Sequence, residues 1–131
     1  GRKLLTHVSD VMRHGDDVPR VGLQAGLMEL MRVISAKGLG MSAIVDAQQR
    51  VLGIFTDGDL RRLIERGHDL RSLTAAEVMH AGPKVVRDDA LAVDAAALME
   101  QHRITSVLVV DEAGVLVGAL NSNDLMRAKV I

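Results

Sequence analysis

The sequence predicts an α/β fold made of two copies of one β-α-β-β-α unit. Three stretches of the first half recur in the second half in the same order. The pairs are V-S-D-V-M with A-A-E-V-M, L-G-M-S-A-I-V-D with I-T-S-V-L-V-V-D, and V-L-G-I-F-T-D-G-D-L with L-V-G-A-L-N-S-N-D-L. In both copies a stretch with helical spacing of apolar residues lies between β-branched runs. A repeat of this kind indicates that one supersecondary unit has been duplicated.

The two copies differ in length by two residues. The separation along the chain is 67 residues from Val8 to Ala75 and 65 residues from Leu39 to Ile104. We place the two additional residues of the first copy in the loop 19–22.

The elements of each copy follow in a fixed order. A short extended piece at 18–21 and at 84–87 precedes a helix, which apolar residues at every third or fourth position indicate. These residues are Leu23, Leu27, Leu30, Met31 and Ile34 in the first copy, and Leu91, Ala95, Leu98 and Met99 in the second. Polar turn residues then join two β-branched runs as a hairpin, at 42–46 with 51–55 and at 106–110 with 115–120. A closing helix starts at Asp57 or at Ser122.

We assign the first repeat to residues 1–67, a linker to 68–74 and the second repeat to 75–131. A three-stranded unit of this size buries too little apolar surface to be stable alone. We therefore expect the copies to pack sheet against sheet as a disc with pseudo-twofold symmetry, with two related clefts at the strand ends. The chain begins with Gly1 rather than Met, which suggests a piece of a longer protein.

The composition excludes several classes of function. A formal net charge of −1 gives no long-range attraction to nucleic acid or to an anionic membrane. Phe55 is the only aromatic residue, so no stacking platform for single strands can form. Without cysteine there is no disulfide, thiolate metal site or cysteine nucleophile. No apolar run approaches the roughly 20 residues that cross a bilayer, and we expect a cytoplasmic protein.

No catalytic or metal site is predicted. The five histidines have neither the spacing of a zinc site nor an H-E-x-x-H motif. Asp57 and Asp59 resemble the start of a calcium loop, but Leu70 stands where such a loop needs glutamate. No serine is paired with a base in a recognisable motif. The fragment is therefore not expected to be an enzyme, and it requires no cofactor.

The segment T-D-G-D, residues 56–59, has two interpretations. Thr56 stands between a strand and a helix, so its hydroxyl can accept from N–H groups of the first turn, and Asp59 can complete a capping box. A helix start with free N–H groups and a hydroxyl also binds phosphate, and a nearby carboxylate accepts from ribose hydroxyls. Gly53 and Gly58 would keep that approach open.

The second copy has Asn121 and Asp124 where the first has Thr56 and Asp59. Asparagine preserves the cap but removes the hydroxyl. We therefore expect a ligand to prefer the first copy, and the occupancy of the second cleft stays open.

Two tandem β-α-β-β-α copies, each opening with V-M and closing with G-h-h-x-x-x-D-L, resemble a pair of CBS domains, also known as a Bateman module. In that family the segment G-h-h-[Ser/Thr]-x-x-Asp is the ribose-phosphate motif of bound nucleotides. Residues 53–59 match it in full, and residues 118–124 lack the hydroxyl. L-G-M-S, G-I-F-T-D-G-D-L-R-R, A-A-E-V-M and H-R-I-T-S-V-L-V-V-D also resemble the C-terminal half of bacterial arabinose-5-phosphate isomerases, from Leu4 to Ile131.

The resemblance implies a regulatory module whose N-terminal sugar isomerase (SIS) domain is absent from this chain. Such an enzyme interconverts ribulose 5-phosphate and arabinose 5-phosphate on the route to Kdo and lipopolysaccharide. Feedback by the activated end product makes CMP-Kdo the expected allosteric effector, with AMP or ATP as the alternative. The helices after T-D-G-D and N-S-N-D meet between molecules in such modules, which implies a homodimer and is compatible with a tetramer of the full-length enzyme.

The expected contacts follow from the chemistry of such a ligand. Thr56 would bind phosphate or ribose and Asp59 the ribose diol. Arginine suits bidentate contacts with phosphate or carboxylate, although each arginine can equally be a solvated surface residue. His102 is also explained as a helix-end residue. The full set is Gly40, Met41, Ser42, Thr56, Asp57, Asp59, Arg61, Arg62, His102, Arg103 and Ser106.

A rival interpretation treats the repeats as a structural module. In it the clefts stay empty, and the repeats hold the subunits of the isomerase together. The sequence leaves this reading open, together with the base and sugar of any ligand and the sign of regulation.

Overall fold

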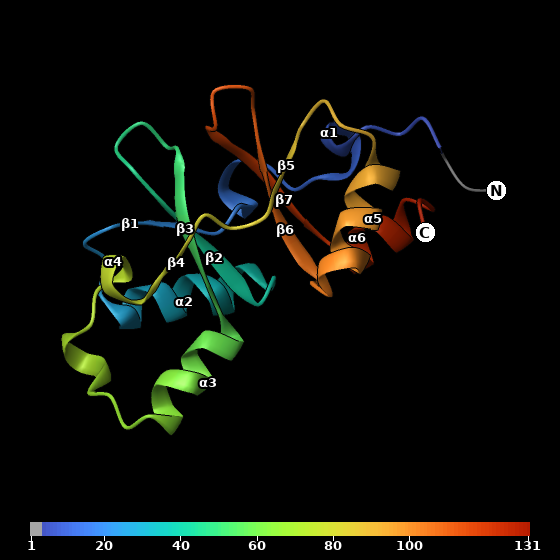
Figure 1. The fold of residues 1–131 in the computed structure, drawn as a ribbon. Coiled ribbons are helices and arrows are strands. Elements are labelled where there is room, and N and C mark those ends of the chain that lie inside the picture. Colours follow the sequence, from blue (N-terminus) through green and yellow to red (C-terminus); the bar gives the residue numbers. More distant parts are fainter. Residues whose placement is uncertain (1–3) are drawn as a thin grey trace. The chain divides into compact units, whose positions relative to one another are not determined.

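A computed structural model describes residues 4–131, and its contacts divide the chain into two compact units (Figure 1). Unit 2 is Pro19–Pro83, and unit 1 combines the residues up to Val18 with Lys84–Ile131. The first three residues of the predicted first repeat lie outside the described part. Each unit holds a mixed sheet and helices, which confirms the predicted α/β class. The boundaries of the packed units differ from those of the sequence repeats, because the segment that opens each repeat packs in the unit of the other.

Unit 2 contains a four-stranded sheet of order β1-β2-β3-β4. β1 is parallel to β2, and β2, β3 and β4 pair antiparallel. The strands are β1 (Arg20–Gly22), β2 (Met41–Val45), β3 (Val51–Thr56) and β4 (His80–Ala81). The helices are α2 (Leu27–Lys37), α3 (Asp57–Glu65) and α4 (Ala75–Val78), with a 3₁₀ turn at Leu70–Ser72.

Unit 1 contains a three-stranded sheet of order β5-β6-β7. β5 is parallel to β6, and β6 is antiparallel to β7. The strands are β5 (Val85–Arg87), β6 (Ser106–Val110) and β7 (Leu116–Asn121). The helices are α1 (Val8–Val11), α5 (Ala92–His102) and α6 (Ser122–Arg127), with a 3₁₀ turn at Gly15–Asp17. Arg13 forms an antiparallel bridge with Ala119, in the place that β4 takes beside β3.

The structure corrects the sequence analysis at three points. The V-M stretches form the short helices α1 and α4, which were not predicted. Leu23 and Leu91 precede their helices, which begin at Leu27 and Ala92. The two additional residues do not lie in the loop 19–22, because β1 and β5 are already separated by 65 residues, the shorter of the two separations between the copies. They lie upstream, where the first repeat makes the turn Gly15–Asp17.

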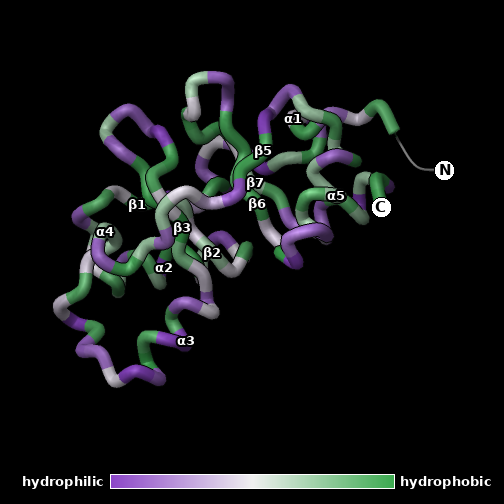
Figure 2. Tube along the Cα trace, in the orientation of Figure 1, coloured by the Kyte–Doolittle hydropathy of each residue, from purple (hydrophilic) through white to green (hydrophobic). Residues whose placement is uncertain are grey.

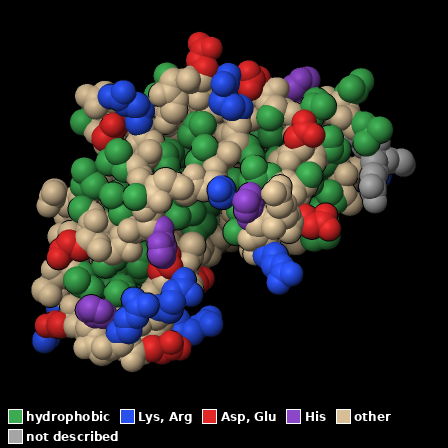
Figure 3. Space-filling view, in the orientation of Figure 1, with side chains coloured by type: hydrophobic (Ala, Val, Ile, Leu, Met, Phe, Trp, Pro, Cys, Tyr) green, Lys and Arg blue, Asp and Glu red, His purple; other side chains and the backbone are tan. Residues whose placement is uncertain are grey.

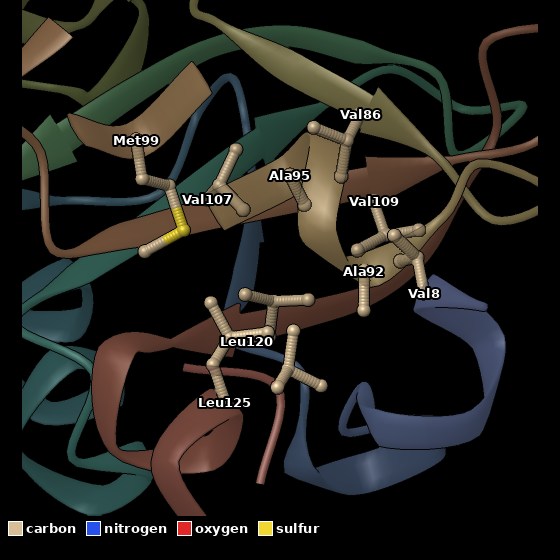
Figure 4. Packing of buried hydrophobic residues seen from close by; sticks show 10 residues of the cluster. Val8, Val86, Ala92, Ala95, Met99, Val107, Val109, Leu120 and Leu125 are labelled. Atoms are coloured by element: carbon tan, nitrogen blue, oxygen red, sulfur yellow. The ribbon is translucent and has the colours of Figure 1, made fainter. Parts of the chain in front are cut away.

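Each unit has its own apolar core. Val8 of α1 is fully buried and packs close to Ala92 and Val109 (Figure 4). Ala75 of α4, the counterpart of Val8 in the repeat, is fully buried in the core of unit 2 together with Phe55. Hydrophobic residues run along the strands, and hydrophilic residues mark the hairpin turns (Figure 2). In residues 4–131 no helix is long and apolar enough to span a membrane.

Candidate functional site

The T-D-G-D segment lies where β3 ends and α3 begins. Thr56 is the N-cap of α3 and has an extended backbone conformation. Its Oγ1 accepts a hydrogen bond from Asp59 N at 3.2 Å, and Thr56 N donates to Asp59 Oδ2 at 2.9 Å. Two N–H groups that the helix cannot satisfy internally are thereby paired. The predicted capping box is confirmed.

The second oxygen of Asp59 is also occupied. Arg62 Nη2 donates to Asp59 Oδ1 at 2.6 Å, and His80 Nε2 lies 2.7 Å from the same oxygen. His80 comes from β4, whose pairing with β3 sets His80 opposite Ile54. The Asp59 carboxylate, only 5% exposed, is thus contacted from β3, α3 and β4.

Gly53 allows β4 to approach β3. A Cβ at this position would lie 2.6 Å from Met79 Sδ and 2.8 Å from His80 O, closer than packed atoms tolerate. The predicted role, an open path for a ligand, is therefore not what requires glycine here. A Cβ on Gly58 would meet only Arg62 and Thr56 atoms at 3.5 Å or more, which is ordinary contact.

Unit 1 repeats around Asp124 the arrangement of side chains that surrounds Asp59 in unit 2. We call these arrangements the Asp59 corner, or first corner, and the Asp124 corner, or second corner. Asn121 caps α6, and Asn121 and Asp124 exchange hydrogen bonds of 2.9 and 3.0 Å in the same capping-box pattern. Arg127 Nη2 donates to Asp124 Oδ1 at 2.6 Å, as Arg62 does to Asp59. Arg13 takes the place of His80, and its Nε donates to Oδ2 at 3.1 Å and its Nη2 to Oδ1 at 3.3 Å.

Both carboxyl groups have a pKa below the ordinary value for aspartate. Burial disfavours the charged form and by itself would raise the pKa of Asp59 and of Asp124. Hydrogen bonds from Arg62, Thr56 and His80 outweigh burial at Asp59 and lower its pKa. At Asp124 the hydrogen bonds come from Arg13, Asn121 and Arg127, and the charge of Arg13 adds to them. Both aspartates are therefore ionised acceptors at neutral pH.

The structure brings several of the predicted contact residues together at the first corner. Asp57 N donates to Gly40 O at 3.1 Å, and Met41 is opposite Thr56 across the β2–β3 pair. Met41 and Ser42 are buried, and Ser42 Oγ donates to Ala43 O at 3.0 Å. Both side chains therefore contribute to the packing of β2. Arg61 is exposed on α3.

The remaining predicted residues lie in unit 1, near the second corner. Ser106 is the register partner of Asn121. Ser122 N donates to Thr105 O, as Asp57 N does to Gly40 O. His102 ends α5, and Arg103 follows it in the left-handed conformation with φ 54°.

His80 and Arg13 were not predicted from the sequence as partners of the two aspartates. Both follow a Val-Met pair directly, so their equivalence was readable from the repeat. The i,i+3 arginine was also readable, because D-L-x-R occurs in both copies. The sequence did not show that the segment after each Val-Met pair lies beside β3 or β7. Nor did it show that the first residue of that segment contacts the aspartate.

A cavity of about 290 Å³ adjoins Asp59 in unit 2. Phe55, Leu63, Leu73 and Val78 give it an apolar part, and Asp59, Arg62, Arg66, His68, Glu77 and His80 supply charged and titratable groups. Lys, Arg and His side chains gather over α3 on this face (Figure 3). The lining therefore places two arginines and two histidines, which can contact acidic groups, beside the carboxylates of Asp59 and Glu77.

Comparison with known proteins identifies what the chain resembles over its whole length. The model of the CBS domain matches residues 8–66 and 75–131. Arabinose 5-phosphate isomerase KdsD of Salmonella typhi is 50% identical over 131 residues, which cover 100% of this chain and 40% of that protein. The chain thus spans about 40% of the length of the curated relatives it matches.

Solved structures share the fold. CBSX2 in complex with AMP superposes with a TM-score of 0.77 at 24% identity, covering 94% of this chain and 95% of that one. A CBS domain protein from Pyrobaculum aerophilum complexed with AMP gives 0.80 at 23% identity, covering 91% and 89%. At these identities the likeness establishes the fold alone, and the AMP belongs to those two proteins.

Proposed function

Because this chain belongs to the CBS domain family and carries two CBS domains in tandem, we propose that it is the ligand-sensing module of an arabinose-5-phosphate isomerase. In this proposal it binds a nucleotide at the Thr56–Asp59 corner and regulates an attached SIS domain. The observation that carries it is the corner itself, where an ionised, buried carboxylate and a threonine hydroxyl meet at the start of α3. The identity with the isomerase relative along the whole chain supports the choice of parent enzyme.

The chemistry of the corner fits a nucleotide. Thr56 Oγ1 accepts from Asp59 N, and its O–H, which also interacts with the Asp59 carboxylate, turns to donate to a phosphate oxygen in this proposal. The carboxylate of Asp59 is an acceptor for ribose hydroxyls. Arg61 and Arg62 on α3 offer cations to further acidic groups.

Among nucleotides we propose CMP-Kdo, the activated end product of the route that the parent enzyme would begin. Its phosphodiester and its carboxylate would both contact the Lys and Arg side chains that gather over α3 (Figure 3). An adenylate is the alternative, and the two AMP complexes of the same fold support it.

Isothermal titration calorimetry of this chain with CMP-Kdo, CMP, AMP and ATP tests the proposal. We expect CMP-Kdo to bind most tightly, CMP more weakly, and Asp59→Ala to abolish both signals while the fold is retained. Tighter binding of AMP or ATP would move the assignment to energy sensing. No heat from any of the four compounds would contradict ligand sensing.

A structural role is the second candidate, because two apolar side chains stand exposed on the helices that follow the corners. Ile64 on α3 is 57% exposed and Met126 on α6 is 52% exposed. We propose that such helices form a homodimer interface. Sedimentation velocity should show a dimer that Ile64→Glu and Met126→Glu weaken, and a wild-type monomer at all accessible concentrations would contradict it.

A further inference from the structure

We propose that the residue after each Val-Met pair decides which of the two aspartates can bind a ligand. The exposed His80 can turn away and admit the diol of a ribonucleotide to Asp59, whereas Arg13 stays in place and keeps Asp124 closed. The inference rests on the proposed function, because it assumes that a ribose hydroxyl pair is what these carboxylates accept.

The acceptor positions of Asp59 are only partly used. A carboxylate offers about four lone-pair positions, two on each oxygen. Within residues 4–131, Oδ1 accepts from Arg62 and His80, and Oδ2 accepts from Thr56 N. The Thr56 hydroxyl also interacts with the carboxylate, and in the proposed complex it turns to the phosphate. If the His80 ring turns away, one position becomes free on each oxygen. Two hydroxyls on neighbouring carbons can then each donate to a different oxygen of Asp59.

The acceptor positions of Asp124 are full. Oδ1 accepts from Arg127 and from Arg13 Nη2, and Oδ2 accepts from Asn121 N and from Arg13 Nε. Arg13 therefore occupies one position on each oxygen, the same two that a diol would need. Its planar guanidinium acts as a ligand supplied by the chain itself.

The two residues differ in how readily they leave. The His80 side chain is 66% exposed and holds its aspartate through one ring nitrogen. The Arg13 side chain is 27% exposed and makes two charge-assisted hydrogen bonds to the carboxylate. The guanidinium of Arg13 presents several N–H donors in one plane, whereas His80 contacts Asp59 through a single ring nitrogen. Displacing Arg13 would also leave a buried carboxylate without its strongest partner.

The ligand class follows from this geometry. The carboxylate of Asp59 selects a vicinal diol, and the neighbouring helix start and cavity suit the anionic part of the same molecule. A ribonucleotide has both features, and a 2′,3′-dideoxynucleotide has only the second.

The test is a reciprocal exchange of the two residues, read by calorimetry with CMP, AMP and their 2′,3′-dideoxy analogues. Wild-type protein should bind one ribonucleotide per chain, with affinity reduced about tenfold or more for the dideoxy analogue. His80→Arg should weaken binding at least about tenfold, and His80→Ala should strengthen it. Arg13→His should raise the number of ribonucleotides bound per chain from one to two.

Arg127→Ala is the matched control for Arg13→His. It removes a cation from the same carboxylate but leaves the bidentate contact of Arg13 in place, so the number of bound ribonucleotides should stay at one. A folded Arg13→His protein that still binds one, or a wild-type protein that binds two with equal affinity, would overturn the proposal.

A measurement without ligand separates this proposal from the proposed function. The Nε proton of Arg13 should exchange with solvent at least about tenfold more slowly than that of exposed Arg61, because it is held by Asp124. Equal exchange rates would refute the closed second site whether or not any nucleotide binds. Slow exchange together with no nucleotide binding would refute the proposed function and the ligand role of His80. Arg13 would then only stabilise the fold through its ion pair with Asp124.

Discussion

The Asp59 corner and the Asp124 corner share one arrangement of side chains and differ at two positions. Both have a capping box, an arginine three residues after the aspartate and a third partner that follows a Val-Met pair. They differ in the cap, Thr56 or Asn121, and in the third partner, His80 or Arg13. The shared parts are those that the fold requires. The parts that differ are the hydroxyl and the access to the carboxylate, which are the parts that a ligand would meet.

The largest effect we predict comes from removing the two carboxylates. Asp124→Ala leaves Arg13 and Arg127 without their anion, and we expect a loss of about 3 kcal/mol in the free energy of unfolding. Asp59→Ala should cost less, about 1.5 kcal/mol, because its partners Arg62 and His80 are more than half exposed and water can replace the carboxylate. Urea unfolding of both variants measures the difference. Equal losses would show that Arg13 contributes no more than His80.

Next in size is a pair of glycine substitutions that should affect both corners alike. A Cβ on Gly118 would collide with Met12 Sδ and lie 2.8 Å from Arg13 O, as a Cβ on Gly53 would collide with Met79 and His80. Gly53→Ala and Gly118→Ala should each destabilise the protein by about 2 kcal/mol through overpacking. Gly58→Ala is the matched control, because its Cβ would make only ordinary contacts at a helical position, and it should be neutral or stabilising by up to about 1 kcal/mol. A tolerated Gly53→Ala would contradict the close approach of β4.

Acid should destabilise the protein through both carboxylates. The pKa of Asp59 and of Asp124 is lowered in the folded chain, so the unfolded chain takes up protons first as the pH falls. The stabilisation is complete above the ordinary aspartate pKa of about 3.9 and is lost as the pH falls through the lowered values. Asp59→Asn and Asp124→Asn should each flatten this loss in urea titrations between about pH 5 and 2. If the dependence of the free energy of unfolding on pH stays the same in a variant, the pKa of that aspartate is not lower in the folded chain than in the unfolded chain. The effect should be smaller than removal of the side chain, because a protonated carboxyl still forms hydrogen bonds.

Much of this comparison was readable from the sequence, for a physical reason. Helical periodicity, β-branched runs and turn residues are local signals, and duplication presented each of them twice. The helix start at Asp57 and the capping by Thr56 and Asp59 follow from four consecutive residues, 56–59, so they were predicted correctly.

The remainder depends on which segments meet in space. The pairing of His80 with β3 could not be predicted, because the strand β4 is only two residues long and therefore shows no periodicity in the sequence. The reason for Gly53 was missed together with it, since the close contact is made by that segment. For the same reason Asp59 was assigned to the cap and to a ligand, and its shared contacts with Arg62 and His80 were not predicted.

The smallest effect on stability, and the sharpest on the comparison, should come from exchanging the two caps. Thr56→Asn and Asn121→Thr each replace one good N-cap residue by another, so the free energy of unfolding should change by less than about 0.5 kcal/mol. Thr56→Asn removes the O–H that we assign to a phosphate oxygen, and CMP or AMP affinity should fall about tenfold. Thr56→Ser, which keeps the hydroxyl, is the control and should bind like the wild type. If Thr56→Asn lowers neither stability nor affinity, the hydroxyl serves only the cap, and the preference for the first corner must come from His80 and Arg13 alone.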